Sequence, residues 1–376
     1  MKSILLSTRS QRSASYRRQR RSYFHLPTRI FRSLMFLAAV ALSGCTDSNG
    51  KSGGNILPIQ SKIFSGVEII GSRGTGLGQF NKPRSLALDK DDNLFVVDMT
   101  GRVQKFSTNG VFLLSWQMPQ TDLGKPKGMC RDAHGNIVVV EPHYMRVNHF
   151  SPDGKFVSQW GFKGTNQGQL MFPRAVAANS RGEFFVTEYG LVERVQHFSS
   201  DGKTILNSIG KPGEGAGEFN RAEGLGIDFK DQLYVADSCN HRIQIFSPEG
   251  KFLRSHGKAG SGVGELSYPY DVRIDSNGLQ FVCEFGNSRV QIFDASDRPV
   301  EILGEVGLAP GQFSNPWSID LDSKGNLYVA DALNHRVQKF LRKNALSASH
   351  WQNAQPTDLA PGIGPEDSAG GTMAAR

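Results

Sequence analysis

Six large side chains stand at regular intervals along the chain, each directly after a proline or, in one case, an alanine. Three are cationic, one is acidic and two are aromatic: Arg84, Lys127, Arg174, Glu223, Tyr270 and Trp317. Where such side chains converge, the cations can clamp an anionic group while the rings stack on an apolar body beside it. The alternative is that they are solvated residues with no ligand. The elements that carry them decide whether they converge.

Those elements belong to a pattern that recurs six times. It comprises a proline, a short apolar segment, a turn with Gly or Asn, a second apolar segment ending in an acid, and Arg-x-x-x-Phe. The closing phenylalanines are 44, 48, 48, 47 and 47 residues apart: Phe106, Phe150, Phe198, Phe246, Phe293 and Phe340. Short β-branched and aromatic runs between turn residues predict strands, and four strands in a repeat of this length form one propeller blade.

Two of the repeats contain the words Asn240-His241-Arg242 and Asn334-His335-Arg336, each preceded by Val-Ala-Asp. These words resemble the NHL repeat, and the resemblance covers roughly residues 61–343. It implies an all-β fold, a six-bladed β-propeller with four-stranded blades. After Phe340 the chain lacks a fourth strand, so the segment Val67–Ile70 is expected to complete the last blade and to cover its open edge.

Residues that recur in every blade are most simply explained by folding, whereas residues that differ at an equivalent position are candidates for function. The recurring acids are Asp98, Glu141, Glu188, Asp237, Glu284 and Asp331. The arginines that follow them are Arg102, Arg146, Arg194, Arg242, Arg289 and Arg336. Each acid and its arginine flank one turn and are expected to pair. His241 and His335 belong to the repeat itself, and we interpret them as turn residues.

The six differing residues are the predicted ligand-binding residues. First strands of a propeller begin at the central channel, so these side chains should ring its mouth. We expect them to be exposed there, so that replacing Arg84, Lys127 and Arg174 together by Ala should barely change stability. Should the site lie elsewhere, the turns around Tyr144 or Tyr189 are the next candidates.

The residues predict no catalytic group, no metal site and no cofactor. The peptide-amidating lyases, which resemble this chain in their propeller, place zinc-binding histidines directly after the first-strand proline. No blade here has a histidine at that position, which disfavours zinc-dependent activity because a catalytic zinc needs about three protein ligands. A binding module is therefore preferred, and the alternative is a propeller enzyme of a non-zinc lactonase or lyase type acting at the channel mouth.

The net charge of +8 suggests a polyanionic partner only until the charges are located. Nine of the 43 basic residues and none of the 35 acidic ones lie in residues 1–44, so residues 45–376 carry a net charge of −1. A domain whose positive and negative charges balance has no overall positive potential that would attract nucleic acid. We therefore expect a protein partner or a small anionic ligand, no nucleic acid, and a monomer.

The basic leader has the parts of an export signal: a cationic segment, an apolar run from Leu34 to Leu42, and Leu42-Ser43-Gly44-Cys45. The last four residues resemble the lipobox of bacterial lipoproteins, which implies lipidation of Cys45. The alternative is a plain signal peptide. We predict an export signal at 1–44, a flexible linker at 45–60, the propeller at 61–343 and a disordered tail at 344–376. The protein should be anchored to the membrane in the cell envelope, facing the periplasm or the cell surface.

The remaining thiols do not suggest a disulfide framework or a metal site. Cys130, Cys239 and Cys283 are odd in number and lie far apart. We interpret Cys130 and Cys283 as small apolar residues within strands.

Overall fold

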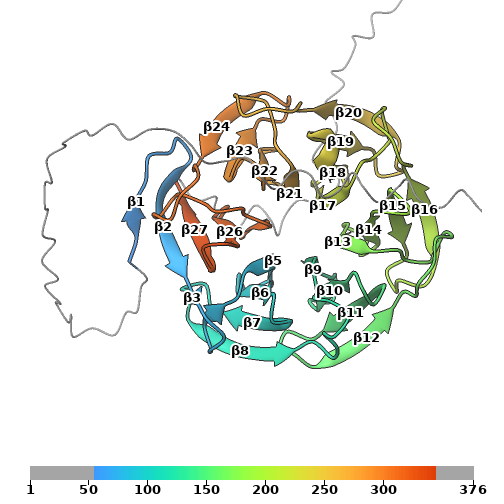
Figure 1. Ribbon diagram of the computed structural model, residues 1–376, viewed down its shortest axis with the longest axis horizontal. Helices are drawn as coiled ribbons and strands as arrows, with labels where there is room; N and C mark the ends of the chain where they lie inside the picture. Colours follow the sequence, from blue (N-terminus) through green and yellow to red (C-terminus); the bar gives the residue numbers. More distant parts are fainter. Residues whose placement is uncertain (1–54, 344–376) are drawn as a thin grey trace, which may run out of the picture. The chain divides into compact units, whose positions relative to one another are not determined.

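The computed structural model describes residues 55–343, which form a closed ring of six β-sheets around a central channel (Figure 1). Within this range the one helical segment is a 3-10 turn at Ser238–Asn240. Each of these six sheets is an antiparallel blade whose first strand lies at the channel, and β3 (Ser72–Arg73) and β4 (Gln79–Phe80) form a separate parallel pair. The predicted all-β, six-bladed propeller is confirmed.

The strands follow the repeat closely. Blade 1 consists of β5 (Pro83–Leu88), β6 (Leu94–Asp98), β7 (Arg102–Phe106) and β8 (Phe112–Gln117). Blade 2 consists of β9 (Met129–Arg131), β10 (Ile137–Glu141), β11 (Arg146–Phe150) and β12 (Phe156–Trp160). Blade 3 consists of β13 (Pro173–Ala178), β14 (Phe184–Glu188), β15 (Arg194–Phe198) and β16 (Ile205–Ile209).

The other half of the ring repeats this arrangement. Blade 4 consists of β17 (Ala222–Ile227), β18 (Leu233–Asp237), β19 (Arg242–Phe246) and β20 (Phe252–His256). Blade 5 consists of β21 (Pro269–Ile274), β22 (Gln280–Glu284), β23 (Arg289–Phe293) and β24 (Pro299–Leu303). Blade 6 consists of β25 (Ile319–Leu321), β26 (Leu327–Asp331), β27 (Arg336–Arg342) and β2 (Phe64–Ile70).

The ring is closed by the N-terminal strand, as predicted. β2 pairs antiparallel with β27, and Val67 lies opposite Phe340. A short strand, β1 (Leu57–Pro58), adds to the outer edge of β2 (Figure 1). On the channel side, the backbone N–H of Lys82 donates to Nδ1 of His335 over 3.2 Å. The first and last segments of the propeller are therefore joined at the outside and near the channel.

The second strand of every blade is buried along its whole length, because neighbouring blades cover both of its faces. This explains why these segments are continuous apolar runs rather than alternating ones. The closing phenylalanines pack between their own blade and the preceding blade of the ring, and Phe106, Phe198 and Phe340 are each 0–1% exposed. Apolar burial of this extent holds the blades at fixed positions around the channel.

The recurring acid and arginine pair in all six blades, as predicted. In blade 4 the Asp237 carboxylate accepts from Arg242 Nε over 2.8 Å and from the Asn220 N–H over 2.8 Å. Arg242 also donates to the carbonyls of Gly215 and Glu218, in the loop that enters the blade. We call these six pairs the scaffold pairs, because each one fixes a loop to its blade.

Several predictions concern residues outside the described range. The export signal at 1–44, Cys45 with its lipobox, the first ten residues of the linker and the tail at 344–376 all fall there. Over residues 55–343, no helix is long and apolar enough to cross a membrane.

Candidate functional site at the channel mouth

The six predicted side chains line one small cavity at an end of the channel. Arg84, Arg174, Glu223 and Tyr270 are the second residues of β5, β13, β17 and β21. Lys127 and Trp317 lie just before β9 and β25. We call this set the mouth ring. The structure brings its members together, and their role in ligand binding stays a prediction.

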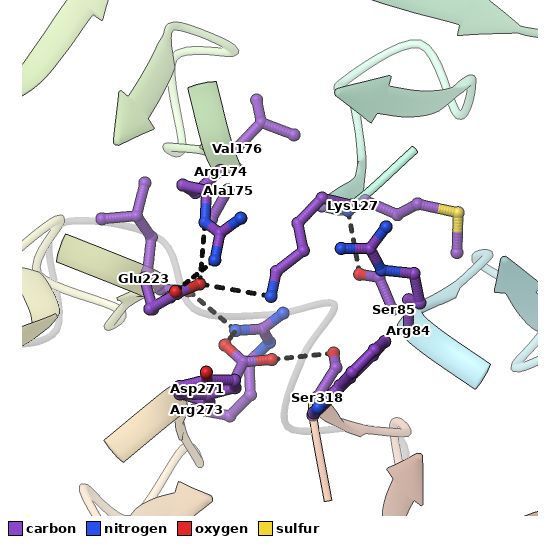
Figure 2. Close-up of a pocket in the computed structure, with 16 residues that line it drawn as sticks. Arg84, Ser85, Lys127, Arg174, Ala175, Val176, Glu223, Asp271, Arg273 and Ser318 are labelled. Atoms are coloured by element: carbon purple, nitrogen blue, oxygen red, sulfur yellow. Dashed lines mark hydrogen bonds and ion pairs between the residues drawn. The ribbon is translucent and has the colours of Figure 1, made fainter. Parts of the chain in front are cut away.

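Glu223 is the centre of the mouth ring, and its residue is 2% exposed. Figure 2 shows Arg174 and Lys127 pointing toward its carboxylate from two other blades. Arg174 donates through Nε over 3.1 Å and through Nη2, and Lys127 Nζ lies 3.2 Å away. Arg221 adds a third cation over 2.7 Å. Burial alone would raise the pKa of Glu223, but Lys127, Arg174 and Arg221 outweigh it and hold that pKa well below its usual range.

Lys127 reaches across the channel and is enclosed by aromatic rings. Its ammonium lies 4.9 Å from the Tyr270 ring centroid and 5.3 Å from that of Trp317. Burial lowers the pKa of Lys127 to about 7, helped by Arg174 and Arg84 and opposed by Glu223. Lys127 therefore holds its proton less tightly than an exposed lysine does.

Arg84 is the cation that Glu223 does not hold directly. Its guanidinium lies 5.1 Å from the Trp317 ring and donates to the Lys125 carbonyl over 3.4 Å. Its Nε is buried without a hydrogen-bond partner, and so is Nε1 of Trp317. Burial and the neighbouring Arg174 lower the pKa of Arg84 to about 10. Two buried donors and one unneutralised cation thus lie side by side.

The expectation that the mouth-ring charges are exposed is wrong. Lys127 and Arg174 are each 8% exposed, because their long side chains fold inward onto Glu223. Replacing Arg84, Lys127 and Arg174 together by Ala would leave the buried Glu223 with Arg221 alone among its present cationic partners. The triple variant should therefore lose stability, contrary to the prediction from the sequence.

The mouth is also nearly closed. The cavity inside the ring measures about 20 Å³, which holds roughly one water molecule. Gly128 and Gly224 allow this closure, since a Cβ at Gly128 would lie 2.6 Å from the Arg174 carbonyl and one at Gly224 2.5 Å from that of Tyr270. Only a small group can enter without side-chain movement, so the body of a ligand must remain outside.

Sequence reasoning missed a second polar layer deeper in the channel. One residue below Tyr270, Asp271 accepts from Ser318 Oγ over 2.8 Å and from Arg273 Nη1 over 2.6 Å. Arg273 Nε lies 3.3 Å from Asp320. At the level of Arg273 and Asp320 the other four blades carry small residues: Ala87, Cys130, Ala177 and Gly226. Comparing blades at this second position would have revealed the pair.

The predictions that His241 and His335 are turn residues and that Cys130 and Cys283 lie within strands are confirmed. His241 and His335 occupy turns with φ of 55° and 57°, and Nδ1 of His241 accepts from the Tyr268 N–H. Cys130 and Cys283 lie within β9 and β22. Among residues 55–343, no group of three or more His, Cys, Asp or Glu side chains is arranged to hold a metal ion.

The sequence matches the NHL repeat family over residues 219–246 and 313–340. A segment of 130 residues is 26% identical to Protein brain tumor of Drosophila melanogaster, covering 34% of this chain and 12% of that protein. A segment of 158 residues is 27% identical to the peptidylglycine alpha-amidating monooxygenase of Rattus norvegicus, covering 38% of this chain and 16% of that protein. The matched region is thus a small part of either relative.

Solved structures resemble the whole ring. A gluconolactonase from Xanthomonas campestris superimposes with a TM-score of 0.57 at 13% identity, over 78% of this chain and 99% of that chain. A virginiamycin B lyase from Staphylococcus aureus, solved with quinupristin, gives a TM-score of 0.51 at 13% identity, over 71% and 82% of the two chains. At these identities the similarity concerns the fold alone. The chain is thus a six-bladed β-propeller, and segments in two of its blades, 219–246 and 313–340, match the NHL repeat family.

Proposed function

We propose that this protein is a binding module of the cell envelope that recognises an anionic group at its channel mouth. The observation that carries the proposal is an imbalance of charge. Arg84, Lys127, Arg174 and Arg221 surround the carboxylate of Glu223, whereas the other carboxylate that lines the cavity, that of Asp271, already pairs with Arg273. Buried charges are costly unless they are paired, so an arriving anion would stabilise cations that Glu223 leaves in excess.

Arg84 is the residue expected to meet this anion first. It lies beside Trp317, and Glu223 is bound directly by the other three cations rather than by Arg84. A guanidinium is suited to a carboxylate or phosphate because its donors form a planar fork. Because the cavity holds about one water, the ligand should insert only a small head group, such as an acidic side chain of a protein or the carboxylate of a small anion.

Export and membrane anchoring are part of the same proposal. The apolar run ending in Leu42-Ser43-Gly44-Cys45 supports a lipid anchor at Cys45. The near-zero net charge of residues 45–376 supports a protein or small-molecule partner rather than nucleic acid. The propeller would then be a rigid disc held at a membrane, with its mouth open to partners in the envelope.

The test compares two arginine variants of the full chain by isothermal titration with citrate and with an acidic peptide. Arg84→Gln should weaken binding about tenfold, as expected for the loss of a charge-assisted hydrogen bond. Arg73→Gln removes an exposed cation outside the mouth ring and should leave affinity unchanged. Binding of citrate alone indicates a small-anion site, and binding of the peptide alone indicates a protein partner. Equal affinity of both variants and wild type would contradict the proposal.

The alternative function, a lactonase or lyase at the mouth, is distinguished by turnover. A binding module leaves its ligand chemically unchanged, whereas an enzyme would consume a lactone faster than the uncatalysed reaction. Loss of such consumption in Arg84→Gln would place an enzymatic reaction at the mouth and would replace the binding proposal.

A further inference from the structure

A larger cavity lies at the other end of the channel, beyond the Arg273–Asp320 pair. It measures about 630 Å³, within the range of small-molecule sites, whereas the mouth cavity measures about 20 Å³. Arg273 lines both cavities, as do Met129, Val176 and Leu225. We call the larger cavity the far chamber.

The far chamber exists because blades 2 to 4 carry small side chains at one level of the channel. Arg273 and Asp320 extend from blades 5 and 6. At the same level, blades 2, 3 and 4 carry Cys130, Ala177 and Gly226. At Gly226 a side chain is excluded, since a Cβ would lie 2.7 Å from the Val272 carbonyl oxygen. The partly exposed residues that blades 3 and 4 add to the lining are the apolar Ala177, Ala178 and Ile227. One wall of the chamber is therefore apolar.

The opposite wall carries charges, and most of its acids already have partners. Asp89 binds Asn93 and Lys105, and the Lys105 ammonium lies 3.0 Å away. Asp92 accepts from the N–H and the hydroxyl of Ser323. Asp322 accepts from Asn326, and Asp320 from Arg273. These carboxylates are occupied in holding turns or in orienting Arg273.

The cations of the chamber are less occupied. Arg131 is exposed at the end of β9, and its side chain makes no hydrogen bond or ion pair with another residue of the described range. Arg273 uses Nε and Nη1 for Asp320, Asp271 and the Leu225 carbonyl, and within the same range nothing accepts from its Nη2. Both guanidiniums are near enough to Cys130 to influence its pKa, which burial raises. The groups left available to a ligand are thus cationic.

We propose that the far chamber is a second binding site, for a small amphipathic carboxylate. The carboxylate would pair with Arg131 and with the free edge of Arg273, and the apolar chain would lie against the wall formed by β13 and β17. Arg273 is already oriented by Asp271 and Asp320, so little conformational freedom is lost when it meets the ligand. The site is separate from the mouth and does not depend on its function.

Isothermal titration of the full chain with octanoate tests the proposal, with octan-1-ol as the uncharged control. Octanoate should bind wild type and octan-1-ol more weakly. Arg131→Gln changes an exposed residue and should weaken octanoate binding about threefold to tenfold. Ala178→Phe fills the chamber and should abolish binding, with thermal unfolding as the check that the propeller is intact. Arg84→Gln, at the mouth, should bind octanoate like wild type.

Three results would overturn the proposal. One is no binding of octanoate to wild type up to about 10 mM, which would show a chamber filled by solvent only. Another is octanoate binding that is unchanged both in Arg131→Gln and in an Ala178→Phe variant that folds. The last is loss of binding in Arg84→Gln alone, which would assign octanoate to the mouth and would favour the mouth proposal instead. If Ala178→Phe does not fold, octanoate binding by Arg131→Gln alone tests the proposal.

Discussion

The scaffold pairs and the mouth ring both bury charge, but they balance it differently. In each scaffold pair one carboxylate meets one guanidinium, and nearby amides supply further hydrogen bonds. Burial still raises the pKa of Asp237 and Glu284, so their single cationic partners do not fully offset desolvation. Glu223 is also buried, yet its pKa falls, because three cations converge on it.

This difference separates folding from function within one repeat. A balanced pair that recurs in six blades needs nothing from outside the protein. A cluster with more cations than carboxylates remains incompletely compensated, and it occurs only where the blades differ in sequence. Excess buried charge at a non-repeating position is therefore the feature on which the proposed ligand site rests.

The largest expected effect follows from removing the mouth carboxylate. Glu223→Gln leaves Lys127, Arg174 and Arg221 without a counter-charge in a buried position. We expect a loss of about 3–5 kcal/mol in the free energy of unfolding, measured by urea denaturation. Adding Lys127→Met should restore part of the loss. An unchanged midpoint in Glu223→Gln would show that the ring is solvated.

A scaffold pair should respond less strongly. Arg242→Gln removes one guanidinium, while Asp237 keeps hydrogen bonds from Asn220, Asn240 and Gln244. We expect a loss of roughly 2 kcal/mol in the free energy of unfolding. The loop that carries Gly215 and Glu218 should also become more sensitive to limited proteolysis. A larger loss than in Glu223→Gln would reverse the ranking of the two regions.

The next effect is a pH dependence that only the mouth ring should show. The pKa of Lys127 is about 7 in the folded protein and 10.5 in its ordinary state. Between these values the unfolded chain binds more protons, so the contribution of Lys127 to stability rises with pH, by at most about 1.4 kcal/mol per unit. Lys127→Met should lose this slope between pH 7 and 10. Parallel stability curves for wild type and Lys127→Met would refute the low pKa.

The smallest effect on the stability of the scaffold pairs and the mouth ring is expected from removing the proposed lipid anchor. Cys45→Ser should move the protein from the membrane to the soluble fraction, because acyl chains provide the proposed attachment. The thermal unfolding midpoint of the propeller should not change. A variant that remains intact in the membrane fraction would show that another segment holds it there.

Much of this structure was accessible from the sequence because it repeats. The scaffold pairs are local, since Asp237 and Arg242 flank one turn, and six copies make their role evident. The position of the mouth ring also followed from the repeat. Each member is either the second residue of the first strand of its blade or lies just before that strand. Local spacing and periodicity were sufficient for these features.

The contacts within the mouth ring were not accessible in this way. Lys127 and Glu223 are on different blades and meet only across the channel, so no spacing along the chain indicates their pairing. Their burial was missed for the same reason, since a long side chain at a rim can fold inward or extend into solvent. Arg221 was missed because it precedes the position that was compared, and Asp271 and Arg273 because they follow it.

The pairing of β2 with β27 has a consequence for how the protein is made. The ring can close only after Phe340 has been synthesised and can pair with Val67. Pairing between residues so far apart in sequence slows folding, because a long loop has to be closed first. At about 5–20 residues per second, synthesis of the intervening chain takes roughly 15–55 s. Until then the edges of the incomplete ring stay unpaired. During this interval a chaperone would therefore protect the nascent chain most.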